Sequence, residues 1–155
     1  MSVLWVRHAT SSPSVARRSV LDALTEAGVA DDDADDAALI TSELVGNAIQ
    51  HASPLPSGGV AIRWSLGQGF YTISVTDGGN RHDDTPGGGE PDGAVIQATQ
   101  PSATATSGRG LSIVQAIASE WGVERTPGRT TVWARRELTE PQREPTVSRP
   151  LSLIG

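Results

Sequence analysis

The chain has 155 residues, 37% of them hydrophobic, and a formal net charge of −6, which suits one folded domain. It contains no Cys and no Lys, so disulfides, thiolate metal sites and the chemistry that needs a P-loop lysine or a strand lysine of the eukaryotic kinase type are excluded. The acidic balance disfavours nucleic-acid binding, and neither a membrane span nor a signal peptide is indicated, so we expect a cytoplasmic protein.

The first third of the chain predicts a short strand and two helices. Residues 2–7 are typical of an edge strand, and the apolar period over residues 13–27 predicts a helix. The acidic run 31–36 is typical of a solvated helix N-terminus in which one Asp caps the helix, with a metal site as the alternative. The helix that follows extends to about His51 or Ala52.

Two strands and a long irregular stretch come next. Residues 59–66 and 70–77 alternate or are β-branched, and the glycine-containing turn between them predicts a hairpin. Periodicity is lost over residues 78–110, where Gly, Pro, Asp, Ser and Thr dominate. We therefore expect a loop there, interrupted only by the apolar pair Val95 and Ile96.

The last part of the chain predicts a helix, a hairpin and a tail. Residues 110–121 resume a helical period, 121–124 and 130–137 predict paired strands, and the Pro-containing segment 139–155 predicts a flexible tail. The resulting fold class is α/β: a two-layer sandwich in which three helices cover one face of a mixed, mostly antiparallel sheet.

A polar stripe follows one face of the second helix. Glu43, Asn47 and His51 are spaced four residues apart, and most other directions of the helix are apolar. Buried polar groups require partners or a ligand. Two interpretations stay open: a solvated face, or a general base next to an oxygen donor for Mg²⁺.

Two glycine motifs flank the irregular stretch. The first, DGGN at 77–80, is either a strand-to-loop turn or a carboxylate fixed at a strand end, where it can accept a hydrogen bond from a base. The second, SGRGL at 107–111, is either a hinge or an anion site at a helix N-terminus. It matches neither a P-loop nor a dinucleotide-binding fingerprint.

Taken in order, these motifs resemble the GHKL (Bergerat-fold) ATP-binding family, and within it the stand-alone anti-sigma-factor serine/threonine kinases. The matching segments are ELVGNAIQHA, VTDGG, GRGLSIVQAIASEWGV and RTTVWARREL, which begin at Glu43, Val75, Gly108 and Arg129. The resemblance implies an ATP-binding domain over residues 1–138.

The resemblance also implies roles for individual residues. Glu43 would be the general base, Asn47 would hold the Mg²⁺ that bridges the ATP phosphates, and Asp77 would accept from the adenine amine. Thr131 would support Asp77 through its hydroxyl or a water molecule. His51 matches a frequent family residue, although a hydrogen-bonded helix-end histidine is the simpler interpretation.

The glycines and one arginine complete the implied nucleotide site. Gly79 would make room for the purine, and Gly108 and Gly110 would cradle the phosphates. Arg109 is either a cationic phosphate contact or a surface arginine. Residues 80–107 would form the ATP lid.

The implied function is transfer of the ATP γ-phosphoryl group to Ser or Thr of a small anti-anti-sigma (STAS-like) protein, with sequestration of a sigma factor. The alternatives are a non-catalytic ATP-binding module that sequesters a partner and a catalytic domain detached from an unusual partner. Phosphoacceptor helices are lacking, so a two-component histidine kinase is not expected. Family members often dimerise, and a homodimer is compatible with the sequence.

Overall fold

The computed structural model describes residues 1–79, 95–97 and 108–143. Within these ranges, six strands form one sheet in the order β1-β2-β3-β6-β5-β4, and every neighbouring pair is antiparallel. The elements are β1 (Ser2–Arg7), α1 (Ser12–Glu26), α2 (Asp31–His51), β2 (Gly59–Leu66), β3 (Phe70–Asp77), β4 (Val95–Gln97), α3 (Gly108–Ile117), β5 (Glu120–Thr126) and β6 (Arg129–Glu137).

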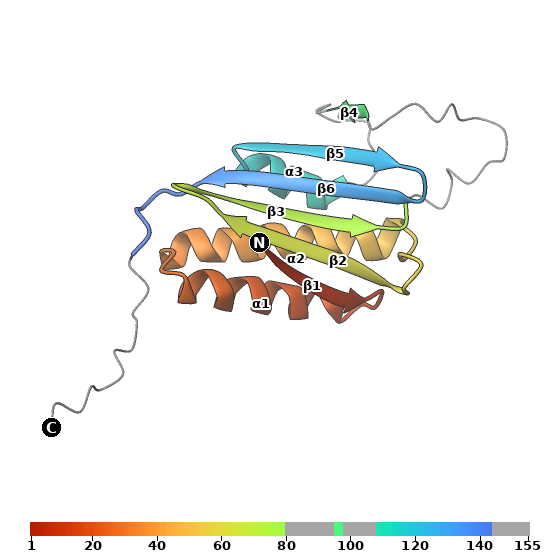
Figure 1. Ribbon diagram of the computed structural model, residues 1–155, viewed down its shortest axis with the longest axis horizontal. Helices are drawn as coiled ribbons and strands as arrows, with labels where there is room; N and C mark the ends of the chain where they lie inside the picture. Colours follow the sequence, from red (N-terminus) through yellow and green to blue (C-terminus); the bar gives the residue numbers. More distant parts are fainter. Residues whose placement is uncertain (80–94, 98–107, 144–155) are drawn as a thin grey trace, which may run out of the picture.

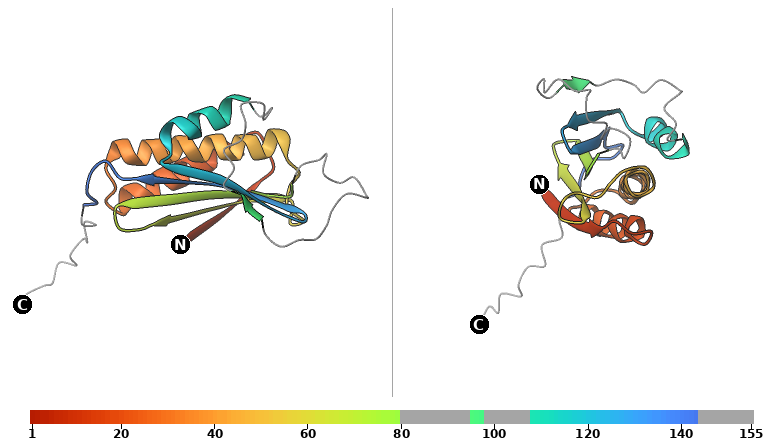
Figure 2. Two further views of the ribbon diagram at one scale, coloured as in Figure 1. Left: turned by 90° about the horizontal axis from the view of Figure 1, so that it is seen from above. Right: turned by 90° about the vertical axis from the view of Figure 1, so that its right-hand side faces the viewer.

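The three helices lie on one face of the sheet, as Figures 1 and 2 show. The expected two-layer α/β sandwich is therefore confirmed, and the sheet is antiparallel throughout its described pairs. Within the described residues, every helix is too short or too polar to cross a lipid bilayer.

One strand lies in the stretch expected to be a loop. Val95–Gln97 forms β4, which pairs antiparallel with β5 and extends the sheet at that edge. Three residues are too few to show an alternating pattern in the sequence. The segment forms a strand because it pairs with the edge strand β5. The other residues of the expected lid, 80–94 and 98–107, lie outside the described residues.

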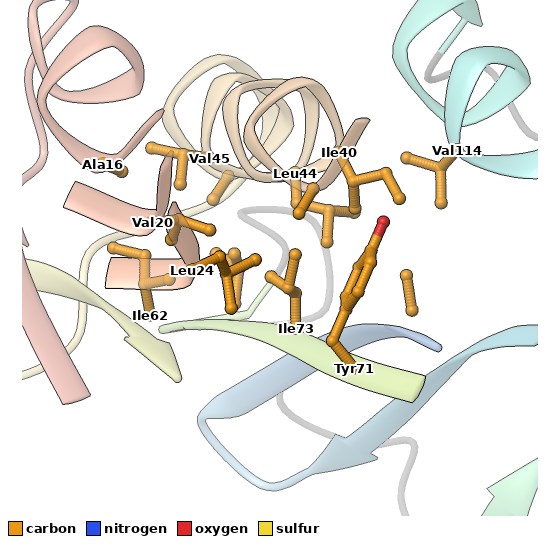
Figure 3. Packing of buried hydrophobic residues seen from close by; sticks show 14 of the residues in the cluster. Ala16, Val20, Leu24, Ile40, Leu44, Val45, Ile62, Tyr71, Ile73 and Val114 are labelled. Carbon is orange, nitrogen blue, oxygen red and sulfur yellow. The ribbon is translucent and has the colours of Figure 1, made fainter. Parts of the chain in front are cut away.

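The core lies between the helices and the sheet. On β3, the buried residues Tyr71, Ile73 and Val75 alternate with half-buried ones, so every second side chain faces the helices. Ile40 and Leu44 of α2 are buried against this face, above Tyr71 and Ile73, as Figure 3 shows. Full burial of one such aliphatic side chain contributes about 1.5–3 kcal/mol.

The acidic run at the start of α2 has a different structural role from the one expected. Asp31 and Asp32 are exposed in the first turn, where they favour the helix dipole, but the N-cap is Ala30 and no side chain caps the helix. Asp33 is fully buried. It accepts hydrogen bonds from the Thr139 backbone N–H (3.0 Å), the Thr139 hydroxyl (2.8 Å) and the Glu140 N–H (3.3 Å).

The acidic run makes a second contact with the end of β6. Asp36 forms a hydrogen-bonded ion pair with Arg136. The Arg136 guanidinium also acts on the hydroxyl of Tyr71, but burial is the larger effect and raises the pKa of Tyr71 to about 12. No group of three or more His, Asp or Glu side chains in the described ranges could hold a metal ion, so the alternative interpretation of this run finds no support there.

The first residues after β6 are docked rather than extended into solvent. The Arg143 N–H donates to the Gly28 carbonyl at 2.8 Å, and Gln142 donates to the Ala27 carbonyl at 2.6 Å. A side chain at Gly28 would overlap Arg143, and its φ of +88° also favours glycine. Residues 144–155 lie outside the described residues, so a flexible tail stays a prediction for them.

We predict that Asp33→Ala destabilises the fold by about 2 kcal/mol, because it removes a buried carboxylate acceptor of three hydrogen bonds. Asp32→Ala, an exposed neighbour in the same helical turn, is the matched control and should change stability by less than about 0.5 kcal/mol. Urea unfolding monitored by circular dichroism measures both. Equal stability losses in the two variants would contradict the anchoring role of Asp33.

Candidate functional site

The polar stripe of α2 lies at the border between the core and solvent. Glu43 and Asn47 are half-buried, whereas His51 is exposed. Helix α2 packs on β3 and α3, and the immediate neighbours of the stripe, Leu44 and Ala48, are buried. The structure therefore separates His51 from the other two residues of the stripe.

The side-chain amide nitrogen of Asn47 lacks a hydrogen-bond partner among the described residues. This Nδ2 atom is buried. A buried unsatisfied polar atom costs about 1–3 kcal/mol, so such atoms call for an explanation. Because neither orientation of the amide is fixed by a bond, its oxygen is equally able to face a ligand.

This observation provides a test of the fit for Mg²⁺. Mg²⁺ is commonly held by one or two protein oxygens together with water and substrate phosphates, rather than by a cage of protein ligands. The described residues contain no such cage, but they offer the Asn47 amide oxygen. The residues present therefore fit a magnesium ion that arrives with a phosphate-bearing ligand.

The Asp77 turn is fixed to the chain that leaves α2. The Gly78 N–H donates to the Ser53 carbonyl at 2.7 Å, and the Ser53 N–H donates to the Gly79 carbonyl at 2.9 Å. A Cβ atom at Gly78 would lie 2.1 Å from the carbonyl oxygen of Pro54, so only glycine permits this approach. Gly79 has a φ of +89°, which again favours glycine.

The Asp77 side chain is buried at the end of β3. It is 5% exposed, and one carboxylate oxygen accepts from the Gly79 N–H at 2.8 Å. Burial raises the pKa of Asp77, and this effect outweighs the hydrogen bond and the nearby His8 and Arg125, which lower it. The carboxylate is thus held in a poorly solvated place where a hydrogen-bond donor would stabilise its ionised form.

The strand register separates the two threonines of β6. Thr131 lies opposite Thr76, and their hydroxyls are 2.8 Å apart on the helix-free face. Both line a depression of about 410 Å³ on that face, together with Trp5 and Arg63. Thr130, in contrast, lies directly across from Asp77. The support of Asp77 expected from Thr131 is therefore better placed at Thr130, because neighbouring strand residues point to opposite faces.

The glycine motif after the irregular stretch begins α3. Gly108, Arg109 and Gly110 form its first turn, as expected, and the helix packs beside α2 and against β5. Unpaired N–H groups at a helix start can bind an anion. The Arg109 side chain lies outside what the structure describes, so its phosphate contact stays a prediction, as do the roles of the two glycines.

The structure adds residues that the sequence did not indicate. The sequence does not single out Thr130, because nothing in the Thr130–Thr131 pair indicates which of the two residues faces the helices. His8 is a lone histidine after a strand, but its ring contacts the end of α2. Arg125 lies across from Thr130 on β5 and lowers the pKa of Asp77.

The arrangement is that of an ATP-binding domain of the GHKL class, as the sequence motifs implied. Residues 8–136 match the histidine kinase-like ATPase domain family, and the chain belongs to this family. A search of the curated proteins found no match.

A solved structure supports the fold. The crystal structure of the RsbU and RsbW domains of Rv1364c from Mycobacterium tuberculosis superposes with a TM-score of 0.64 at 21% sequence identity. The match covers 93% of this chain but only 34% of that chain, so our chain spans about a third of its length.

We predict opposite effects for alanine at two glycines of the site region. Gly46→Ala meets no atom within 4 Å and replaces a helix-interior glycine, so it should stabilise the fold by up to about 1 kcal/mol. Gly78→Ala places a Cβ atom against the Pro54 carbonyl, forces the two backbone segments apart and should destabilise the fold by about 2 kcal/mol. Thermal unfolding of both variants is the measurement, and a stable Gly78→Ala protein would contradict the close approach.

We predict that Asp77→Asn stabilises the ligand-free protein at pH 7. The folded pKa of Asp77 is raised above its ordinary value of 3.8, so its ionisation penalises folding as pH rises through and above that value. Asn retains the acceptor for the Gly79 N–H without the charge. The gain in melting temperature should vanish below about pH 3.5, where the carboxyl is protonated in both states. A gain that is independent of pH would argue against this origin.

Proposed function

We propose that the protein binds ATP with Mg²⁺ and transfers the γ-phosphoryl group to a Ser or Thr hydroxyl of a small STAS-like partner protein. The carrying observation is the Asn47 amide nitrogen, which is buried and unpartnered among the described residues, with Glu43 one turn earlier on the same helix. Membership of the histidine kinase-like ATPase family and the likeness to a chain containing an RsbW domain support the proposal.

The phosphate half of the site is assigned to α2 and to the start of α3. Asn47 would hold Mg²⁺, which when bound neutralises charge on the phosphate oxygens and orients them. The first-turn N–H groups of α3, at Gly108 and Gly110, would bind phosphate oxygens, and Arg109 would add a positive charge. Since the chain contains no Lys, the positive charge for this task comes from arginine, with backbone N–H groups as further donors.

The reaction requires one base. Glu43 and Asn47 are four residues apart, a rise of about 6 Å along the helix, so a metal-bound phosphoryl group and the base can be neighbours. The carboxylate of Glu43 would take the proton of the attacking hydroxyl as its oxygen bonds to phosphorus. The bond from phosphorus to the bridging oxygen breaks, and ADP leaves with that electron pair.

The adenine-binding half of the site is assigned to the turn after β3. Asp77 would accept from the exocyclic amine of adenine, and Gly79 would leave space for the ring. Thr130 is the hydroxyl across from Asp77.

We further propose that the protein is a cytoplasmic regulator that sequesters a sigma factor. A module that uses ATP only as a ligand is the competing function, which the next experiment separates.

We predict that Glu43→Gln keeps ATP affinity within about threefold but lowers phosphoryl transfer by 10²-fold or more, because it removes the base. Asn47→Ala should remove most of the Mg²⁺-dependent part of ATP binding. Calorimetry measures binding, and labelled ATP with STAS-like candidate proteins measures transfer. Glu26→Gln, an exposed glutamate on α1, is the control and should leave both unchanged.

The outcomes separate the candidates. ATP at 100 times its Kd should stabilise the wild type by about 2.7 kcal/mol, and a melting temperature that does not move would contradict ATP binding itself. Binding without transfer in the wild type would favour the non-catalytic module. Transfer that survives Glu43→Gln would refute the assigned base.

A further inference from the structure

His8 connects the N-terminal part of the chain to the end of α2. It follows β1, and its Nε2 atom lies 2.9 Å from the Ala52 carbonyl oxygen and 3.3 Å from that of Ala48. Carbonyl oxygens only accept hydrogen bonds, so these contacts require a hydrogen on Nε2. The ring thus donates to the last turn of α2 and to its C-cap residue.

This helix end is fixed by the backbone contact of Ser53 with Gly78 and Gly79, and it has no glycine termination. Ala52, the C-cap residue, is in an extended conformation with φ −118° and ψ 163°, so the left-handed glycine termination common at helix ends is not used here. His51, the basic residue of the last turn, is exposed. Among the described residues, His8 is the side chain that bonds to these two carbonyl groups.

The turn held by His8 lies between the two halves of the candidate site. Asn47 immediately precedes Ala48, one of the two acceptors. Ser53 immediately follows Ala52, the other acceptor, and exchanges backbone hydrogen bonds with Gly78 and Gly79. The two carbonyl groups bonded by His8 therefore belong to the residue next to Asn47 and to the residue next to Ser53, which holds the Asp77 turn. His8 also lies close enough to Asp77 to lower its pKa against the effect of burial.

We propose that His8 is a positioning residue that fixes the spacing between Asn47 and the Asp77 turn, and thereby between the phosphate and base subsites. The proposal rests on the ATP binding proposed above. It assigns to the segment before α1 a share in nucleotide affinity without any contact of His8 with the nucleotide. A role limited to general stability would affect affinity only through the unfolded fraction.

Three variants separate these roles. His8→Leu removes the donor, His8→Gln keeps an N–H donor at similar reach, and Val20→Ala truncates a fully buried core residue of α1. Calorimetric titration with MgATP, well below the melting temperature of each protein, should give a Kd about tenfold weaker for His8→Leu. The Kd should change less than threefold for His8→Gln and for Val20→Ala.

Amide hydrogen exchange provides a readout that needs no nucleotide. In His8→Leu, the Ser53 and Gly78 N–H groups, which hold the Asp77 turn, should exchange at least tenfold faster. The Gly67 N–H, bonded to the Phe70 carbonyl at 2.8 Å in the β2–β3 hairpin, is the internal control and should not change. Val20→Ala should not reproduce this local pattern.

The possible failures are distinguishable. A wild type that binds no ATP refutes the proposed function. The exchange pattern then still tests whether His8 holds the end of α2 and the Asp77 turn together. Unchanged MgATP affinity in His8→Leu overturns the positioning role, whatever the exchange shows. Equal loss of affinity in His8→Leu and His8→Gln overturns the assignment to the donated hydrogen bond. A loss of affinity shared by Val20→Ala reduces His8 to a stabilising residue.

Discussion

The structure depends on the close backbone contact between the end of α2 and the end of β3. Ser53 exchanges two hydrogen bonds with Gly78 and Gly79, and the absence of a side chain at Gly78 permits it. Helix α2 is buried along most of its length against the sheet, so its axis is already fixed by packing. The contact then fixes its end, and it places an amide of the helix and a carboxylate of the strand on one side of the sheet.

The same constraint explains which parts of the fold could be predicted. Helices and strands of eight residues or more carry a readable period, and all of those expected were found. The spacing of Glu43 and Asn47 within one helix could likewise be predicted, because four residues return to the same face. Strand β4 could not, because its three residues form a strand only through the partner they pair with.

Long-range contacts set the parts of the site that local pattern missed. Thr130 and Thr131 are identical residues, and only the pairing of β6 with β3 decides that Thr130 lies across from Asp77. His8 meets its acceptors 40 and 44 residues later, a separation about which a lone histidine carries no information. The acidic run was predicted only in part for the same reason, since Asp31 and Asp32 are exposed as expected but no Asp caps the helix. Its composition indicates a solvated helix start, but Asp33 is bound by a segment about a hundred residues away.

Two features of the site oppose the stability of the protein without a ligand. Burial raises the pKa of Asp77, so its ionised form at neutral pH disfavours folding. The buried Asn47 amide lacks a hydrogen-bond partner among the described residues. The buried Asp33, in contrast, accepts hydrogen bonds from three donors. Asn47 and Asp77 lie on the two elements joined by the Ser53 contact, where a polar ligand would add hydrogen bonds to both. A nucleotide that supplies an amine to Asp77 and a phosphate oxygen as acceptor to the Asn47 Nδ2 would relieve both costs together. Ligand binding and folding stability should therefore be strongly linked in this domain.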